Sequence, residues 1–452
     1  MVLTSHCRRL LYLLREFGNQ MSTKVICVVG LGYVGLPLAC LFADKGYETI
    51  GLEKERKKVE LINQGICPLR GKEPGLNEIL LSVVNKRKLI ATSDPEICSQ
   101  ANAIFICVDT PINEFQKPVL TFLECAVMEV GKRLKKGALV AVESTLPPGT
   151  MNNFVIPLLE SVSGLRAGND FYIVYSPERI LPGNVIVSLK KNARIIGCHD
   201  EKSLSLAREI YSAIVEAPIY ETDMLTAEIV KTVENAYRDV QIAFANEVAL
   251  ACEELGADVF EVRRLVNTSP FRDMHLPGSG VGGHCLTKDP WLFASSITRQ
   301  SLPLISTARA INDSMPKHLA ALAIEALCEA GIEVSKSKIS VLGLAFRKDL
   351  GDTRNSPALV VIDTLRKDAK IIVHDPYAEP PIDIAFTRDI NEALRDSDCA
   401  IFVTDHSDYF TIDLQEMAKL MHTRIIVDGR NLFDAKKCRE KGFIYRGIGK
   451  GR

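Results

Sequence analysis

The stretch Lys24–Gly35, KVICVVGLGYVG, decides how the N-terminal part of this chain folds. A short run of β-branched and apolar residues is typical of a buried parallel strand, and the glycines after it form the pattern GxGxxG. Residues 37–45 then have the composition of a helix that ends at Gly46, and residues 47–52 predict a second strand with Glu53 at its end. Strand, glycine turn, helix and a carboxylate about twenty residues on predict a dinucleotide-binding fold.

The turn is expected to bind NAD. Its glycines allow a pyrophosphate to approach the start of the helix, and the carboxylate of Glu53 can accept hydrogen bonds from ribose hydroxyls. An acid at this position favours NAD over NADP, although Lys54, Arg56, Lys57 and Lys58 follow it closely. The cofactor-binding residues expected in this turn and strand are Gly30, Gly32, Tyr33, Val34, Gly35 and Glu53.

The alternation of strands and helices continues after this unit. Further apolar runs predict parallel strands over residues 103–108, 138–142 and 171–175. Ligands bind at the carboxyl ends of such strands, so Thr110 and Thr145, which follow the first two runs, are expected to face the cofactor. Glu178 follows the third run and is a candidate site carboxylate, and the alternative is a loop acid paired with Arg179.

Residues 222–255 carry the longest helical pattern. Apolar side chains recur at helical spacing at Leu225, Ile229, Val233, Ala236, Val240 and Phe244. Thr222 or Asp223 can cap the start, and Gly256 can end the helix. At ~1.5 Å per residue the helix would be ~50 Å long, more than one domain needs. We therefore expect a spine between domains and a homodimer surface.

Lys231 and Asn235 share one face of this helix because they lie four residues apart. Both are polar beside an apolar stripe, which could place them in an active site. The alternative, which the spacing alone favours, is a pair of side chains that face solvent.

Residues 278–291, GSGVGGHCLTKDPW, predict the reactive centre. Glycines let the backbone turn sharply and approach a ligand. Cys285, Lys288 and Asp289 then bring a thiol, an ammonium and a carboxylate within five residues, as a covalent active site requires. The alternative is a glycine-rich surface turn with a buried structural cysteine.

A second α/β unit begins at Lys338 and repeats the first pattern. It predicts a helix over 356–366 and strands over 339–342, 370–374, 400–404 and 424–427. Ala345 replaces the second glycine of the fingerprint, and basic residues follow it. We interpret this as a dinucleotide fold altered to take another anionic nucleotide, with Arg354 and Arg430 suited to phosphate or carboxylate.

Composition limits the remaining possibilities. A chain of 452 residues is expected to form two or three domains. A formal charge of -1 gives no electrostatic case for nucleic acid or an anionic membrane, and no apolar run reaches the ~18 residues of a membrane span. Thirteen cysteines without a CxxC pair suit a reducing cytoplasm and predict neither a disulfide framework nor a metal site.

Seven ordered motifs resemble the UDP-glucose/GDP-mannose dehydrogenase family of nucleotide-sugar 6-dehydrogenases over nearly all of residues 23–435. They are GLGYVGLP at 30–37, ESTLPPGT at 143–150, SPER at 176–179, KxxxN at 231–235, GVGGHC at 280–285 with Asp289, GLAFRKDxxDxRxSP at 343–357 and DGRN at 428–431. The resemblance implies NAD-dependent, four-electron oxidation of the C6 hydroxyl of a nucleotide-sugar to the uronic acid, in a homodimer.

The resemblance also implies residue roles. Cys285 would attack the C6 aldehyde, and Lys231 and Asn235 would stabilise oxyanions. Asp289 would handle protons and water. Positions implicated in water activation and the thioester step match Glu178 and Thr145, and Lys288 joins the cofactor-binding set. The substrate-binding set is Glu178, Arg179, Lys231, Asn235, Arg272, Gly282, Phe346, Arg347 and Arg430.

Some positions depart from the family pattern. Arg347 stands where lysine is usual, and Arg272 matches an arginine that reaches across the dimer. His284 resembles the N-acetylhexosamine branch, whereas Lys288 resembles the glucose branch. We therefore expect UDP-N-acetyl-D-mannosamine as substrate, with UDP-N-acetylglucosamine or UDP-glucose as alternatives. A non-catalytic sensor of NAD and nucleotide-sugar is a remoter alternative, because a sensor needs no nucleophile.

These inferences define an expected α/β architecture of two Rossmann-like doubly wound domains joined by a long central helix and a helical dimerisation region. The expected boundaries are an N-terminal extension over 1–22, an NAD-binding domain over 23–222, a central domain over 223–316 and a UDP-sugar-binding domain over 317–452.

Overall fold

The computed structural model describes residues 24–69, 71, 73–180 and 182–451. The expected extension at residues 1–22 therefore lies outside the described residues. The chain forms two compact units. The first runs to Lys231, apart from residue 71 and Ile112–Pro118, which belong to the second unit with the chain from Thr232 onward.

The first unit is built on an eight-stranded sheet with the order β3-β2-β1-β4-β5-β6-β7-β8. Its strands are β1 (Val25–Val29), β2 (Glu48–Leu52), β3 (Leu89–Thr92), β4 (Ala103–Ile106), β5 (Leu139–Val142), β6 (Tyr172–Tyr175), β7 (Arg194–Gly197) and β8 (Ile219–Thr222). Neighbouring strands are parallel except β6 and β7. The first six strands have the 3-2-1-4-5-6 order of doubly wound nucleotide-binding folds.

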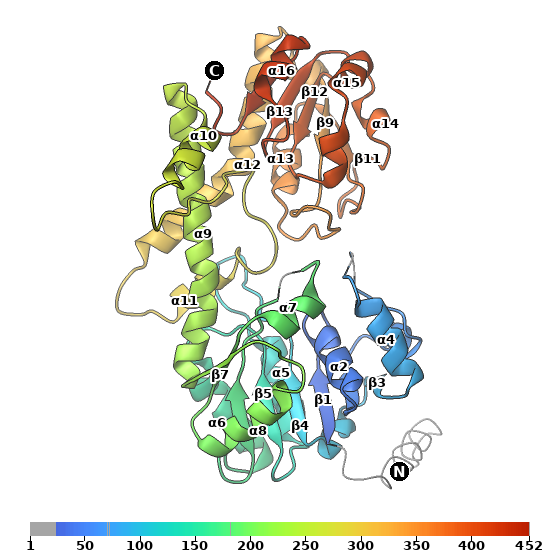
Figure 1. The fold of residues 1–452 in the computed structure, drawn as a ribbon, viewed down its shortest axis with the longest axis vertical. Coiled ribbons are helices and arrows are strands. Elements are labelled where there is room, and N and C mark those ends of the chain that lie inside the picture. Colours follow the sequence, from blue (N-terminus) through green and yellow to red (C-terminus); the bar gives the residue numbers. More distant parts are fainter. Residues whose placement is uncertain (1–23, 70, 72, 181, 452) are drawn as a thin grey trace. The chain divides into compact units, whose positions relative to one another are not determined.

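Helices cover both faces of this sheet (Figure 1). Ile26 and Val28 of β1 pack with α2, whereas Cys27 and Val29 point to the other face and pack with α5. Both sets are buried, as parallel strands between two helical layers require. The helices are α2 (Gly35–Asp44), α3 (Arg56–Asn63), α4 (Leu76–Asn85), α5 (Thr121–Gly131), α6 (Ile156–Ser163), α7 (Val185–Lys191) and α8 (Glu201–Tyr211).

The second unit repeats the same strand order, β11-β10-β9-β12-β13-β14. All pairs are parallel, and the strands are β9 (Lys338–Leu342), β10 (Lys370–His374), β11 (Ala385–Thr387), β12 (Cys399–Phe402), β13 (Ile425–Asp428) and β14 (Ile444–Gly447). The expectation of two Rossmann-like folds is confirmed. The remaining helices are α10 (Val259–Val266), α11 (Asp289–Ser295), α12 (Pro303–Glu329), α13 (Pro357–Leu365), α14 (Ile390–Leu394), α15 (Leu414–Leu420) and α16 (Ala435–Glu440).

Helix α9 (Met224–Leu255) confirms the long predicted helix. Asp223 caps it by accepting a hydrogen bond from the Thr226 N–H at 2.9 Å, and Gly256 ends it with φ +76°. The predicted apolar stripe of α9 packs only in part within the described chain, where Ala236 is buried. Val233 and Phe244 are 37% and 58% exposed, whereas its buried positions are mainly small or polar.

Helix α12 was not predicted from the sequence. Pro316 lies inside it, and a proline within a helical pattern normally indicates that a helix ends before that residue. Most of its buried residues are apolar, but two of them, Arg309 and Asn312, are polar. The Arg309 Nη1 donates to the Asp239 Oδ1 on α9 at 2.5 Å, and the Asn312 Nδ2 donates to the same oxygen at 2.8 Å. Arg309, Asn312 and Asp239 are at most 1% exposed, so α9 and α12 pack partly through a buried ion pair.

We expect Arg309→Ala to lower the free energy of unfolding of the second unit by ~3–5 kcal/mol, because Asp239 would remain buried without its cation. The double variant Arg309→Met, Asp239→Leu should recover most of this loss. Urea denaturation measures both. Arg366→Ala, which breaks the exposed pair with Asp363, is the control. Equal effects of Arg309→Ala and Arg366→Ala would contradict this account.

Candidate active site

The glycine turn between β1 and α2 leaves room for a ligand. Gly30 has φ +90°, and a Cβ there would lie 2.9 Å from the Cys107 carbonyl oxygen. A Cβ on Gly35 would collide with the Gly30 carbonyl, so Gly30 and Gly35 are required by the turn itself. A Cβ on Gly32 would meet nothing within 4 Å. The space beside Gly32 fits a pyrophosphate that approaches the start of α2.

Glu53 lies at the end of β2, beside this turn. One carboxylate oxygen accepts the Leu31 N–H at 3.1 Å, and the other accepts the Glu55 N–H at 3.1 Å. A carboxylate has about four acceptor positions, so Glu53 keeps capacity for ribose hydroxyls. Together with the space at Gly32, this hydrogen-bond acceptor fits NAD, which supplies the hydride acceptor when bound.

The strand ends of β4 and β5 are tied together next to the same turn. The Thr110 hydroxyl donates to the Thr145 carbonyl at 2.6 Å, and the Ser144 hydroxyl donates to the Val108 carbonyl at 2.6 Å. The structure therefore brings Thr110 and Thr145 together at the carboxyl edge of the sheet, where the sequence placed them.

Glu178 follows β6 and is 8% exposed. Its Oε1 has no hydrogen-bond partner among the described residues. Burial raises the pKa of Glu178 to about 7, against the opposing charge of Lys231. A carboxyl group with a pKa near neutrality can take up and release protons at physiological pH, as a general base must. Lys231 is itself buried, so it is not the solvent-facing residue that its spacing alone favoured.

A buried cluster next to Glu178 was not recognised from the sequence. The Glu143 carboxylate accepts from the guanidinium of Arg194 and from the hydroxyl of Tyr211. The Glu178 N–H donates to the Glu143 carbonyl, so this cluster fixes the backbone that carries Glu178. Glu143 was visible as a strand-end acid, but Arg194 and Tyr211 lie 51 and 68 residues away in the chain and no spacing signals them.

In the second unit, Asp289 is the centre of a buried polar group. Its Oδ2 accepts from the Asn235 amide at 2.5 Å, and its Oδ1 accepts from the Lys288 ammonium at 2.8 Å. Asp289 is fully buried and Lys288 is 5% exposed. The structure thus joins three residues that the sequence singled out, and it gives Lys288 a carboxylate partner.

The glycine-rich segment before Asp289 is held at several points. The Gly278 N–H donates to the Asn246 Oδ1 at 2.9 Å, and the Ser279 hydroxyl donates to the Val403 carbonyl at 2.7 Å. Cys285 is exposed, and its carbonyl accepts the Asp289 N–H at 2.8 Å. Cys285 is therefore an accessible thiol one turn before a buried carboxylate, not a buried structural cysteine.

Residues expected to bind the nucleotide-sugar lie around this segment in the same unit. A Cβ on Gly282 or Gly283 would meet Phe346, and the Arg430 guanidinium lies against Gly278. Burial lowers the pKa of Arg430, and its Nε donates to the Val403 carbonyl at 3.1 Å. Two other arginines, Arg347 and Arg272, are exposed.

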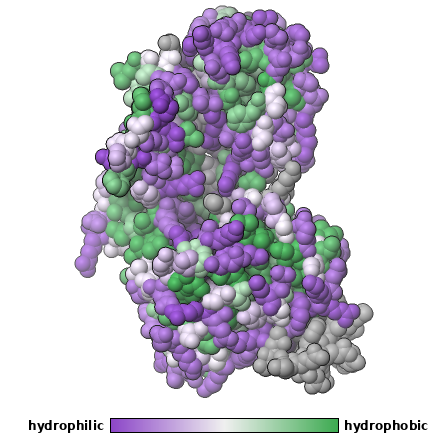
Figure 2. Space-filling view, viewed as in Figure 1, coloured by the Kyte–Doolittle hydropathy of each residue, from purple (hydrophilic) through white to green (hydrophobic). Residues whose placement is uncertain are grey.

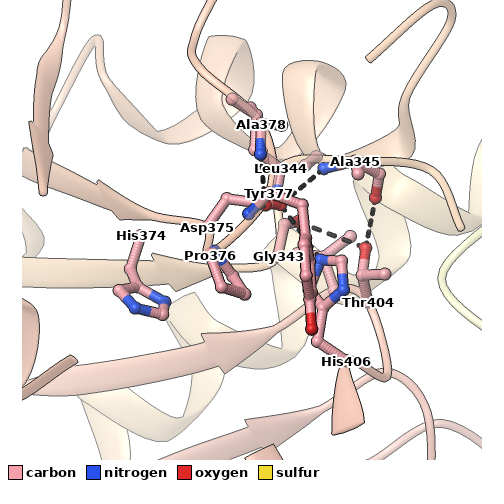
Figure 3. Close-up of polar contacts among 12 residues, drawn as sticks. Gly343, Leu344, Ala345, His374, Asp375, Pro376, Tyr377, Ala378, Thr404 and His406 are labelled. Atoms are coloured by element: carbon pink, nitrogen blue, oxygen red, sulfur yellow. Dashed lines mark hydrogen bonds and ion pairs between the residues drawn. The ribbon is translucent and has the colours of Figure 1, made fainter. Parts of the chain in front are cut away.

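The second unit has a turn like that of Gly30–Gly35, at the end of β9, but a carboxylate already occupies its N–H groups (Figure 3). Asp375 follows β10, and its Oδ2 accepts from the N–H groups of Leu344 and Ala345 at 2.7 and 2.8 Å. Its Oδ1 accepts from the N–H groups of Tyr377 and Ala378, both at 2.7 Å.

The imidazole of His406 is the fifth donor to Asp375 (Figure 3). The distance from His406 Nε2 to Asp375 Oδ2 is 3.0 Å. The His406 Nδ1 accepts the Asp349 N–H at 2.9 Å, so the ring proton lies on Nε2. Five donors exceed the usual capacity of a carboxylate. Asp375 therefore has no acceptor position left for a ribose hydroxyl, which distinguishes this unit from the one that carries Glu53.

The described residues also lack two features that would point to other functions. No three His, Cys, Asp or Glu side chains in this part of the chain are grouped as a metal ion would require. No helix there is long and apolar enough to cross a membrane.

The fold and these residues define a dinucleotide-dependent dehydrogenase that carries a second nucleotide-binding fold and an accessible thiol. The chain belongs to the UDP-glucose/GDP-mannose dehydrogenase family: it matches the NAD binding domain over residues 24–215, the central domain over 225–314 and the UDP binding domain over 340–435. It is an NAD-dependent nucleotide-sugar dehydrogenase, and NAD is its cofactor.

The relatives of this chain include several that are named UDP-N-acetyl-D-mannosamine dehydrogenase. The one from Pyrococcus horikoshii is 41% identical over 427 residues, which cover 94% of this chain and 99% of the relative. The one from Methanococcus aeolicus is 37% identical over 444 residues, which cover 96% of this chain and 97% of the relative. A solved structure of the Pyrococcus horikoshii UDP-D-ManNAc dehydrogenase matches with a TM-score of 0.89 at 40% identity, over 94% of this chain and 99% of that one.

Gly32→Val should keep the fold and abolish most NAD binding, because a Cβ at Gly32 meets no protein atom within 4 Å and the side chain would extend into the pyrophosphate space. Loss of one or two hydrogen bonds to a charged group corresponds to a roughly 100-fold weaker affinity. Titration calorimetry with NAD measures the effect, and Gly32→Ala should give a smaller loss. Unchanged affinity would remove this turn from the cofactor site.

Proposed function

We propose that this chain oxidises the C6 hydroxyl of UDP-N-acetyl-D-mannosamine to give UDP-N-acetyl-D-mannosaminuronate, a precursor for polysaccharide biosynthesis in the cytoplasm. The observation that carries the proposal is the accessible Cys285 next to the buried Asn235–Asp289–Lys288 group in a chain of this family. Similarity to enzymes named UDP-N-acetyl-D-mannosamine dehydrogenase supports the substrate, and His284 before the cysteine agrees with it.

The first oxidation converts the alcohol to an aldehyde and removes one hydride. We assign pyrophosphate binding to the turn that carries Gly30, Gly32 and Gly35, with Tyr33 and Val34, and ribose binding to Glu53. Thr110, Thr145 and Lys288 complete the proposed cofactor set. Lys231 and Asn235 stabilise the negative charge that develops on the C6 oxygen.

The second oxidation needs the thiol of Cys285. Its thiolate attacks the aldehyde carbon and forms a thiohemiacetal, so the reactive aldehyde is not released. Removal of the second hydride gives a thioester at the same carbon. Water then attacks the thioester, the C–S bond breaks, and the thiol is regenerated with the carboxylate product. Four electrons leave the sugar in all.

The hydrolysis step needs groups that activate water. Glu178 is suited to this because burial raises its pKa to about 7, and Asp289 and Thr145 are assigned to the same step. Binding of the UDP-sugar is assigned to Glu178, Arg179, Lys231, Asn235, Arg272, Gly282, Phe346, Arg347 and Arg430. On this basis we propose functional divisions at residues 23–222, 223–316 and 317–452.

The apolar stripe of α9 supports a homodimer. Hydrophobic atoms reach the surface on the left of the view in Figure 2, where α9 runs. On α9 itself, Tyr237 and Phe244 lie seven residues apart and are 63% and 58% exposed. Residues seven apart share one face of a helix, so a second copy could bury both.

Cys285→Ser should separate the two oxidations. The first hydride transfer needs no thiolate, whereas serine is too weak a nucleophile to form the covalent adduct at a useful rate. The variant should therefore release or retain aldehyde and yield almost no uronic acid. Lys231→Ala should instead slow both steps by about 10²–10³. Mass analysis of the products after prolonged incubation with NAD and nucleotide-sugar distinguishes these outcomes. Near-normal uronic acid from Cys285→Ser would show that the cysteine is not the nucleophile.

Tyr237→Glu together with Phe244→Glu should convert the protein to a monomer at micromolar concentration, because burying two carboxylates in the interface is unfavourable. Sedimentation velocity measures the mass. Phe115→Glu changes a phenylalanine that is 73% exposed elsewhere and should leave the dimer intact. A wild-type protein that sediments as a monomer would refute the dimer.

A further inference from the structure

Gly283, two residues before the nucleophile, is fixed by contacts from one distant segment. Its N–H donates to the Arg354 carbonyl at 2.9 Å, and its carbonyl accepts from the Asn355 side-chain amide at 3.0 Å. Both hydrogen-bonding groups of the Gly283 backbone therefore depend on residues 354–355. This segment was not expected to touch the reactive centre, and Asn355 had no assigned role.

The Asn355 amide makes a second contact in the same place. It also donates to the Thr287 hydroxyl at 3.2 Å, and that hydroxyl donates to the Gly283 carbonyl at 2.7 Å. Gly283, Thr287 and Asn355 form a closed set of hydrogen bonds, and Gly283 and Thr287 lie on either side of the residues 284–286 that include Cys285. Below we call these three residues the clamp.

The clamp requires an unusual backbone at Asn355. Its φ is +49°, in the left-handed region that asparagine tolerates better than most side chains. The side chain and the backbone thus agree at this position. An asparagine can adopt this conformation, and its side-chain amide can also donate hydrogen bonds to the Gly283 carbonyl and the Thr287 hydroxyl.

The other end of the clamp is the loop proposed to hold the nucleotide. The Phe346 N–H donates to the Asp352 carbonyl at 3.0 Å, which closes the loop, and Asn355 follows three residues later. The Phe346 ring would lie 2.8 Å from a Cβ on Gly283, so ring and glycine are in close contact. The nucleotide loop and the segment that carries the nucleophile are therefore joined by direct contacts.

We propose that Asn355 is a positioning residue that couples nucleotide binding at the Phe346–Asp352 loop to the position of the Cys285 thiol. A nucleotide that immobilises the loop also immobilises the thiol through the clamp, so the thiol is aligned only when substrate is bound. The proposal rests on the proposed function for the reactivity of Cys285 and for nucleotide binding at this loop. In this proposal Asn355 does not contact the substrate, because it acts through Gly283 and Thr287.

The test uses Asn355→Gly in the full-length protein. Glycine accepts the positive φ without strain, so the variant removes the amide and keeps the backbone. We expect kcat for uronic acid formation to fall by about 10–100-fold, since a misplacement of ~1 Å can cost 10²-fold, with KM for the nucleotide-sugar changed by less than about threefold. Asp396→Gly, also at a positive φ of 54°, is the matched control and should behave as wild type.

A second readout does not depend on turnover. Alkylation of Cys285 by iodoacetamide is followed by peptide mass analysis without NAD, with and without saturating UDP, and the exposed Cys125 and Cys328 are internal references. UDP should slow alkylation of Cys285 several-fold in the wild type and have little effect in Asn355→Gly. Thr287→Val should weaken the UDP effect, and Thr287→Ser should restore it.

Three outcomes would overturn the proposal. The first is that UDP does not slow alkylation of Cys285 in the wild type, and the second is that UDP slows it equally in Asn355→Gly. The third is that Asn355→Gly no longer binds UDP in calorimetry, which would make Asn355 a direct ligand. A different result would separate the two proposals. If the wild type makes no uronic acid, but UDP slows alkylation in the wild type and not in Asn355→Gly, the proposed function is refuted and the role of the clamp is retained.

Discussion

The burial of the Asp289 carboxylate is the constraint on which the reactive part of the molecule depends. A carboxylate without water is unfavourable by several kcal/mol unless donors replace the water. Here the donors are the Asn235 amide on α9 and the Lys288 ammonium, and Asp289 can be buried only where both reach it. Because the Asp289 N–H also donates to the Cys285 carbonyl, the same constraint fixes the backbone of the proposed nucleophile.

The two Rossmann-like folds show how one architecture serves two purposes. In each, an acid at the end of the second strand accepts N–H groups of the turn after the first strand. Glu53 accepts the Leu31 N–H of the turn and the Glu55 N–H of its own segment, whereas Asp375 accepts four backbone N–H groups and His406. Saturation of Asp375 explains in physical terms why the second fold is not another dinucleotide site. From the sequence, the replacement of the second fingerprint glycine by Ala345 indicated a different nucleotide but gave no reason for it.

Local patterns in the sequence were sufficient for the folds and for the residues next to glycine turns. The strand, turn and helix at Lys24–Gly35, the long helix and the second α/β unit were predicted because each depends on neighbouring residues. Helix α12 was missed because Pro316 lies inside it, and a proline within a helical pattern normally indicates a helix end. The cluster at Glu143 and the contacts of Asn355 were missed because their partners are distant in the chain, and only packing brings them together.

The polar groups that matter most here are buried or held by long-range contacts. Spacing could suggest that Lys231 and Asn235 share a face of α9, but it could not show that the amide of Asn235 binds Asp289 or that Lys231 is buried. Similarly, the sequence indicated that Glu178 is a candidate site carboxylate at a strand end, but it could not show that burial raises the pKa of Glu178 to about 7. The chemistry of the site follows from desolvation, which sequence patterns do not report.

The central claim is that one thiol carries a substrate through two successive oxidations, and the stoichiometry of NADH to uronic acid tests it most directly. Purified protein is incubated with UDP-N-acetyl-D-mannosamine, UDP-N-acetylglucosamine, UDP-glucose or GDP-mannose, and both products are quantified. The account predicts two NADH for each uronic acid, no free aldehyde, and the highest kcat/KM with UDP-N-acetyl-D-mannosamine. One NADH for each sugar with accumulation of aldehyde, or no NADH with any of the four, would contradict it.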